Sequence, residues 1–246
     1  LGTRPSNLWT HAQDNVFLSI QGDCDLERFV HVSPQVSIIC HADLLGSGNG
    51  EDFPEANRTP AAYIARLYEL DGDHFATELR GWFSIILYDP KEKGIKFWTD
   101  HFGIRRLVYR KSPRGFGVAS DLRLLNGFFD EVPEIDPAAI IQYMQYTCIP
   151  APRTIYKDTM RLEPGHRHDS RSNSGPRPYW DMRYGEIGQR GLNAWEEQTY
   201  AAIEAAVGRA AKTADDSERL GCFLSGGTDS SCVSGLVGRH TGAPPS

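Results

Sequence analysis

"GCFLSGGTDSSCVSGL", the stretch from Gly221 to Leu236, passes from a short apolar run through two adjacent glycines into a helix-like run. The apolar run predicts a strand over Leu220–Leu224, and the second run predicts a helix. Glycines directly before a helix let the backbone approach a bound anion, and the helix start supplies unpaired N–H groups and partial positive charge. The stretch therefore predicts a phosphate-binding turn between a strand and a helix, where α/β sheets bind ligands.

The side chains of this turn indicate which phosphate chemistry it serves. It contains no lysine, whereas a Walker-type loop places a lysine on the β and γ phosphates. The whole pyrophosphate can then be held as a leaving group while a nucleophile attacks the α phosphorus. Asp229 is unfavourable beside phosphates unless a cation intervenes, so we expect it to bind Mg²⁺. We expect ATP and Mg²⁺ to be bound by Leu224, Ser225, Gly226, Gly227, Thr228, Asp229, Ser230 and Ser231.

Length, charge and cysteine content bound the remaining possibilities. The chain has 246 residues, enough for one large domain or two smaller ones. A net charge of -6 argues against a nucleic-acid surface, and no run of eighteen apolar residues predicts a membrane span. Five cysteines without a C-x-x-C pair favour a reducing, cytoplasmic location. The first and last residues resemble neither a natural start nor a natural end, so we expect further sequence on both sides.

Hydrophobic patterning predicts sheets with buried faces that are covered by helices. Asp136 suits the N-cap of a helix and Pro137 its first position, while Asn193 and Glu196 resemble a capping box. Asp100 and His101 are interpreted as a packed turn, and the polar stretch His166–Arg177 as a loop. The expected strands are Val16–Ile20, Val36–Cys40, Trp82–Tyr88, Ile95–Asp100, Arg106–Arg110 and Gly115–Ser120, and the expected helices include Ala61–Gly72 and Asp136–Tyr146.

The turn "SGGTDSS" resembles the PP-loop of ATP pyrophosphatases, written S-G-G-x-D-S. Those enzymes include asparagine synthetases, GMP synthetases, argininosuccinate synthetases and tRNA-modifying enzymes. The resemblance implies AMP-forming chemistry and leaves the substrate open. A tight glycine turn without a ligand is the alternative, and seven such residues in a strand–turn–helix setting speak against it.

Three stretches further upstream resemble the asparagine synthetase family, in that family's order. They are "LRGWFSIILYDPKEKGIKFWTDHFGIRRLVYR" (Leu79–Arg110), "CIPAPRTIYKDTMRLEPGH" (Cys148–His166) and "YWDM" (Tyr179–Met182). The resemblance implies a glutamine amidotransferase-like domain over residues 1–187, an α+β sandwich of the N-terminal nucleophile hydrolase type with αββα layers. It also implies that residues 188–246 begin an α/β PP-loop domain of the adenine nucleotide alpha hydrolase type.

The amidotransferase-like part departs from that family where glutamine would bind. The family begins with a nucleophilic cysteine, which Leu1 is not, and Cys24 is internal. Val16 and Phe17 stand where the family has arginines. His41-Ala42-Asp43 replaces N-G-E, and Thr59-Pro60 replaces S-D. Because losing one partner of a buried charged contact costs roughly 2–5 kcal/mol, we expect glutamine hydrolysis to be lost.

This pattern resembles the β-lactam synthetases and the macrolactam-forming cyclases of lasso peptides. It predicts a ligase that activates a carboxylate as an acyl-adenylate for attack by an amine, with its catalytic residues beyond Ser246. The expected partners are a small-molecule or peptide carboxylate and either a second copy of the chain or a peptide-processing protein, without nucleic acid or membrane. The alternatives are a glutamine-dependent asparagine synthetase with its cysteine upstream, a tRNA-modifying PP-loop protein and a non-catalytic relative.

Overall fold

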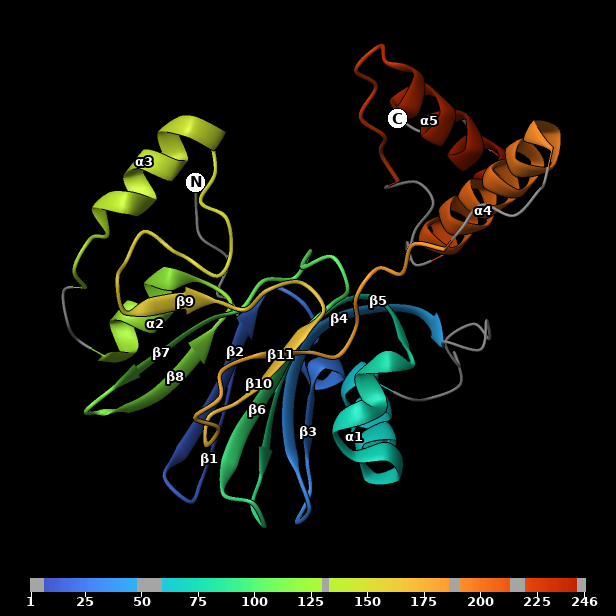
Figure 1. Ribbon diagram of the computed structural model, residues 1–246. Helices are drawn as coiled ribbons and strands as arrows, with labels where there is room; N and C mark the ends of the chain where they lie inside the picture. Colours follow the sequence, from blue (N-terminus) through green and yellow to red (C-terminus); the bar gives the residue numbers. More distant parts are fainter. Residues whose placement is uncertain (1–6, 48–58, 130–132, 186–190, 213–219, 243–246) are drawn as a thin grey trace. The chain divides into compact units, whose positions relative to one another are not determined.

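The computed structural model describes residues 7–47, 59–129, 133–185, 191–212 and 220–242 (Figure 1). The chain divides into two compact units, Leu1–Asp181 and Met182–Ser246, which are described separately. The domain boundary predicted at 187/188 lies outside the described residues.

The first unit is built on a six-stranded antiparallel sheet with the order β11-β10-β6-β5-β4-β3. A tight turn joins its two central strands, β5 and β6, into the hairpin predicted from the sequence. The strands are β3 (Val30–Val32), β4 (Ser37–Ser47), β5 (Leu79–Asp89), β6 (Gly94–Thr99), β10 (His166–Asp169) and β11 (Arg177–Pro178).

One face of this sheet is covered by α1 (Pro60–Asp71) and the short helix η2 (Gly72–Thr77), as Figure 1 shows. Alternate residues of β4 and β5 point toward this layer, so that Ile38 and Ile85 pack with Ile64 of α1. Phe75 of η2 lies 4.9 Å from Trp98 between ring centroids, and both side chains are fully buried. This layer forms the larger hydrophobic core.

The opposite face of the sheet packs against two smaller sheets. These are the hairpin β1 (Asn7–Gln13)–β2 (Val16–Gly22) and the three-stranded sheet β8-β7-β9, with Tyr88, Phe97 and Leu18 buried between the layers. The strands of the three-stranded sheet are β7 (Val108–Ser112), β8 (Gly115–Ala119) and β9 (Thr159–Arg161).

A second helical layer closes the unit on the outer side of the three-stranded sheet. α2 (Leu122–Phe129) buries Leu125 and Phe129 there. A Cβ atom on Gly117 of β8 would lie 2.8 Å from Leu125 Cδ1, so glycine at this position lets the α2 side chains pack closely on the strand. The resulting order of layers, helix–sheet–sheet–helix, agrees with the predicted sandwich.

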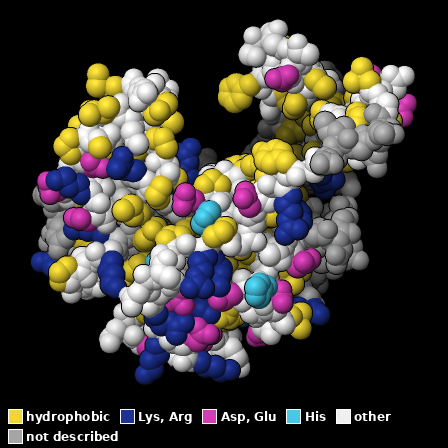
Figure 2. Space-filling view, in the orientation of Figure 1, with side chains coloured by type: hydrophobic (Ala, Val, Ile, Leu, Met, Phe, Trp, Pro, Cys, Tyr) yellow, Lys and Arg dark blue, Asp and Glu magenta, His cyan; other side chains and the backbone are white. Residues whose placement is uncertain are grey.

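α3 (Pro137–Tyr146) starts as predicted, with the Asp136 carboxylate accepting a hydrogen bond from the Ala138 N–H at 3.0 Å. Ala139 is its buried residue, whereas Ile141 and Met144 are 65% and 79% exposed. Figure 2 shows hydrophobic side chains gathered over this helix. α3 therefore contributes little to the core of its unit.

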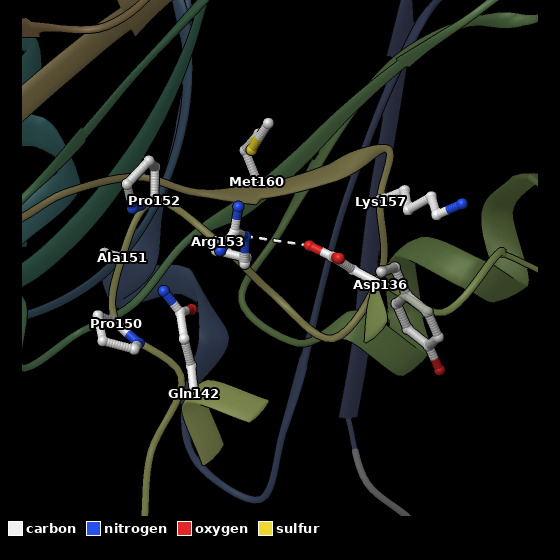
Figure 3. A pocket seen from close by; sticks show the side chains of 9 residues that line it. Asp136, Gln142, Pro150, Ala151, Pro152, Arg153, Lys157 and Met160 are labelled. Atoms are coloured by element: carbon white, nitrogen blue, oxygen red, sulfur yellow. Dashed lines mark ion pairs between the residues drawn. The ribbon is translucent and has the colours of Figure 1, made fainter. Parts of the chain in front are cut away.

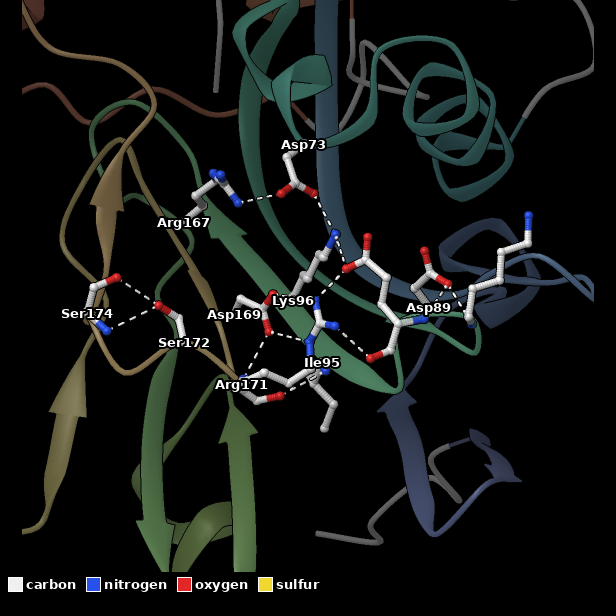
Figure 4. A network of polar contacts seen from close by, with 12 residues as sticks. Asp73, Asp89, Ile95, Lys96, Arg167, Asp169, Arg171, Ser172 and Ser174 are labelled. Carbon is white, nitrogen blue, oxygen red and sulfur yellow. Dashed lines mark hydrogen bonds and ion pairs between the residues drawn. The ribbon is translucent and has the colours of Figure 1, made fainter.

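The predicted loop His166–Arg177 is wrong in its first part, because His166–Asp169 forms β10 beside β6. The polar sequence is stabilised as a strand by its neighbours. His168 is buried among aromatic rings, and Arg167 donates to Asp73 at 2.6 Å (Figure 4). The same Asp73 carboxylate accepts from Lys96 of β6 at 2.9 Å. Charges from β6, β10 and η2 thus form one network.

The second unit contains α4 (Leu192–Lys212) and α5 (Thr228–Thr241) in its described part. The predicted capping box is wrong, since α4 begins at Leu192 and Asn193 lies inside it. The predicted strand Leu220–Leu224 is also absent from this described unit, where the segment is irregular and Phe223 is fully exposed. A strand requires a hydrogen-bonded neighbour, and the described residues of this unit supply only helices. Among the described helices, none is long and apolar enough to cross a membrane.

Candidate functional site

The predicted phosphate-binding turn forms the start of α5. Gly226 has a φ of +80°, a conformation that favours glycine, and Gly227 is the N-cap with extended backbone. The Gly227 carbonyl accepts hydrogen bonds from the Ser231 N–H at 3.1 Å and the Ser231 hydroxyl at 2.8 Å. The two glycines thus bend the chain directly into the helix, as the sequence predicts.

Serine hydroxyls gather around this bend. The hydroxyls of Ser225 and Ser230 lie 3.0 Å apart, and Ser230 also donates to the Gly227 carbonyl at 3.1 Å. No side chain caps the first N–H groups of α5, so these donors remain available at the positive end of the helix dipole. A Cβ atom built on Gly226 would meet nothing within 4 Å, which leaves open space above the bend. This donor set suits an anion with several oxygens.

Asp229 lies in the first turn of α5 at the surface. Within the described part of the chain, its carboxylate has no hydrogen-bond or ion-pair partner, and no group of three or more His, Cys, Asp or Glu side chains forms a metal site. Asp229 could therefore supply one ligand to Mg²⁺, which commonly takes its other ligands from phosphate and water. Leu224 and Thr228 complete the predicted set, and both are exposed.

The first unit shows the contacts of the residues at the positions where the resemblance predicts glutamine binding. Phe17 at the start of β2, where the resemblance predicts an arginine, is 57% exposed. Thr59 and Pro60 begin α1: the Thr59 hydroxyl accepts from the Ala62 N–H at 3.3 Å, and Pro60 is the first helical residue. These two positions therefore serve helix initiation.

At the position where the resemblance predicts N-G-E, this chain has an ion pair between Asp43 and Arg105. Asp43 of β4 accepts a hydrogen bond from Arg105 at 2.5 Å, with the two side chains 38% and 32% exposed. A bulge follows in β4 between Leu44 and Gly46, opposite Gly81 of β5. A Cβ atom on Gly81 would lie 2.2 Å from the Asp43 carbonyl oxygen, so glycine permits the close approach of the strands here. His41, on the same face of β4 as Asp43, has its pKa lowered by burial and then by Arg105.

Arg105 is held in place by a turn built around Asp100. The Asp100 carboxylate accepts hydrogen bonds from the backbone N–H groups of Phe102, Ile104 and Arg105 at 2.9–3.1 Å. It also accepts from the Phe83 N–H of β5 at 3.3 Å. The prediction of a packed turn at this point is confirmed. The pairing of Arg105 with Asp43 was not predicted, because 62 residues separate the two in sequence.

Comparison with known proteins first defines the class. Residues 54–180, about half of the chain, match the glutamine amidotransferase domain family. Residues 199–245 match the asparagine synthase family. The first unit is therefore a glutamine amidotransferase-type domain, as predicted, whereas the PP-loop fold of the second unit stays a prediction.

Individual relatives agree with these matches. A putative glutamine-hydrolysing asparagine synthetase of Mycobacterium tuberculosis (strain H37Rv) is 31% identical over 180 residues, covering 68% of this chain and 27% of the relative. Asparagine synthetase 1 of Bacillus subtilis is 27% identical over 162 residues, covering 64% and 24%. Amidase chry2 of Gibberella zeae is 24% identical over 190 residues, covering 76% and 28%. The chain belongs to the asparagine synthetase family and spans about a quarter of the length of these relatives.

Proposed function

We propose that this chain is part of an ATP-dependent amide-bond ligase that releases AMP and pyrophosphate. The observation that supports this most directly is the lysine-free bend at Gly226 and Gly227, which opens an uncapped helix beside three serine hydroxyls. Donors of this kind suit a pyrophosphate leaving group. Cytoplasmic location is part of the same proposal.

In this proposal, a substrate carboxylate oxygen attacks the α phosphorus of ATP, and the bond from that phosphorus to the bridging oxygen breaks. An amine then attacks the acyl carbon of the acyl-adenylate, loses a proton and expels AMP. Backbone N–H groups at the start of α5 and the hydroxyls of Ser225, Ser230 and Ser231 stabilise the negative charge that develops on pyrophosphate. Asp229 supplies a ligand to Mg²⁺, which neutralises phosphate charge.

The amine comes from the substrate in this proposal, so that a lactam or macrolactam is formed and glutamine is not hydrolysed. Three features of the first unit support this. Asp43 is neutralised by Arg105, Thr59 and Pro60 start a helix, and Phe17 offers no charge to a carboxylate. The substrate class is a small-molecule or peptide carboxylate, with a second copy or a peptide-processing protein as partner.

The experiment measures exchange of labelled pyrophosphate into ATP across candidate carboxylates and identifies the nucleotide product. AMP with pyrophosphate is expected. The variant Gly226→Ala should reduce exchange on the order of 10²-fold, because alanine at φ +80° displaces the donors of the bend. Gly235→Ala is the matched control, since this glycine lies within α5 with open space around it.

Two results would contradict this proposal. Formation of ADP and orthophosphate would contradict the proposed chemistry at the α phosphorus. Release of glutamate from glutamine would instead identify a glutamine-dependent asparagine synthetase. The bacterial relatives are named as enzymes of this kind.

A further inference from the structure

A cavity of about 390 Å³ lies within the first unit, between α3 and the segment leading into β9 (Figure 3). Its volume is within the range of small-molecule sites. Its lining includes Asp136, the N-cap of α3, and Gln142 within that helix. The segment between α3 and β9 contributes Pro150, Pro152 and Arg153, and β9 contributes Met160. None of these residues belongs to the phosphate-binding turn or to the glutamine-binding positions.

Arg153 presents part of its guanidinium to this cavity. Its Nε lies 3.0 Å from a carboxylate oxygen of Asp136, so the two side chains form an ion pair. Within the described residues, its two terminal nitrogens have no protein acceptor, and the side chain is 43% exposed. Two terminal guanidinium nitrogens without a protein acceptor can hold a carboxylate through two parallel hydrogen bonds.

Gln142 adds an acceptor that lacks a donor. Its side-chain oxygen is buried, and no group among the described residues donates a hydrogen bond to it. Leaving a buried oxygen unpaired is unfavourable, because it has lost its hydrogen bonds to water. A ligand that places an N–H group here would remove that cost.

The surroundings of the cavity carry more positive than negative charge. Lys157 is paired with Glu134 and also lies near Asp158, and Arg153 is paired with Asp136. Beside them stands Arg161, which has no carboxylate partner within the described residues.

Arg161 carries this excess charge close to the cavity. It donates to the Ile149 carbonyl at 3.3 Å, next to Pro150, while its Nε is buried without a partner. Burial, followed by the nearby Arg106, lowers the pKa of the Arg161 guanidinium. Arg106 likewise has no ion-pair partner in the described part of the chain. In a protein of net charge -6, this local excess favours an anionic ligand.

We propose that the cavity binds a small organic carboxylate that also carries an N–H group, the combination found at the C-terminal residue of a peptide. The carboxylate accepts from the free edge of Arg153, and the N–H group donates to the Gln142 oxygen. Pro150, Pro152 and Met160 provide apolar surface for the ligand's side chain. The residues of this site lie outside the proposed ATP-binding turn, and the test does not depend on ligase activity.

The binding test titrates the full 246-residue chain with N-acetyl-L-leucine, followed by calorimetry and by NMR shifts. Saturable binding to one site is expected, with N-acetyl-L-leucinamide binding roughly tenfold more weakly because it lacks the charge that Arg153 recognises. Absence of saturable binding, or equal binding of the amide, would overturn the proposal. Inorganic phosphate that competes as well as N-acetyl-L-leucine would also overturn it, because the Gln142 contact requires an N–H group.

Three variants locate the site. Arg153→Lys keeps a positive charge beside Asp136 but removes the planar fork, and Gln142→Met removes the acceptor. Each should weaken binding about fivefold to tenfold. Lys91→Gln removes an exposed positive charge elsewhere on the same unit and should leave binding unchanged. Equal weakening by all three variants would indicate unspecific attraction of charge, and unchanged binding in Gln142→Met, whose side chain fits the same volume, would place the ligand elsewhere.

Discussion

Arg105 donates to Asp43 at 2.5 Å and so joins the turn after β6 to the middle of β4. The carboxylate at this position is thereby neutralised by the protein itself. The same contact brings positive charge near His41, which contributes to the lowered pKa of that imidazole after the effect of burial. An ion pair thus occupies the position at which the sequence resemblance predicts substrate-binding residues.

The strength of this pair can be measured with a double-mutant cycle of Asp43→Asn and Arg105→Gln. Both side chains are about one-third exposed, so solvent screens the attraction and the coupling free energy should be about 1 kcal/mol or less. Urea unfolding of the four proteins gives this value. A coupling energy several times larger would show that the pair behaves as a buried one.

Gly81→Ala should destabilise the first unit by at least about 2 kcal/mol, because Gly81 has a φ of +135° and an added Cβ would collide with the Asp43 carbonyl. The matched control is Gly127→Ala in α2, where the added Cβ meets nothing within 4 Å. That control should leave stability unchanged or raise it by up to about 1 kcal/mol. Denaturant unfolding measures the free energy of unfolding of both variants. Equal changes in the two variants would contradict the role of Gly81 in the close approach of the strands.

Lys96→Met tests the charge network of Figure 4. Lys96 is 4% exposed and donates to Asp73, Glu92 and Tyr68 at 2.8–3.1 Å. Asp73 and Glu92 keep Arg167 and Arg171 as partners in the variant, so the expected loss is about 1–3 kcal/mol.

The control for this substitution is Lys91→Met on the neighbouring turn, where the lysine is exposed. It should change the free energy of unfolding by no more than about 0.5 kcal/mol. A Lys96→Met protein as stable as its control would show that the network adds nothing to folding.

Stability should fall on acidification below about pH 6.5. Burial lowers the pKa of His168 from its ordinary value of 6.5, and burial likewise lowers the pKa values of His41 and His101. In this pH range the unfolded chain therefore binds protons that the folded chain does not, which favours unfolding. His168→Phe, which preserves the contacts with Phe97 and Tyr109, should reduce the slope of stability against pH, whereas His74→Gln at an exposed position should leave it unchanged. An unchanged slope in His168→Phe would contradict the assignment.

Local sequence patterns correctly predicted the helices and strands in which the hydrophobic residues of the pattern are also the buried ones. The apolar strands β5 and β6, the periodic helix α1 and the Asp136–Pro137 start of α3 were all predicted. β10 was not, because its sequence His-Arg-His-Asp is polar and becomes a strand through β6 and the ion pairs around Asp73. The turn at Gly226 and Gly227 was predicted because its residues are adjacent in the chain. The pairing of Asp43 with Arg105 depends on how distant strands meet, which a local pattern does not contain.

The turn built on Asp100 has an evolutionary consequence. Its path is fixed by main-chain N–H groups that converge on one carboxylate, so the outward side chains that follow are not needed to maintain its shape. Arg105 and Arg106 stand on this stable support. Selection can therefore exchange such side chains for new chemistry with little loss of folding free energy.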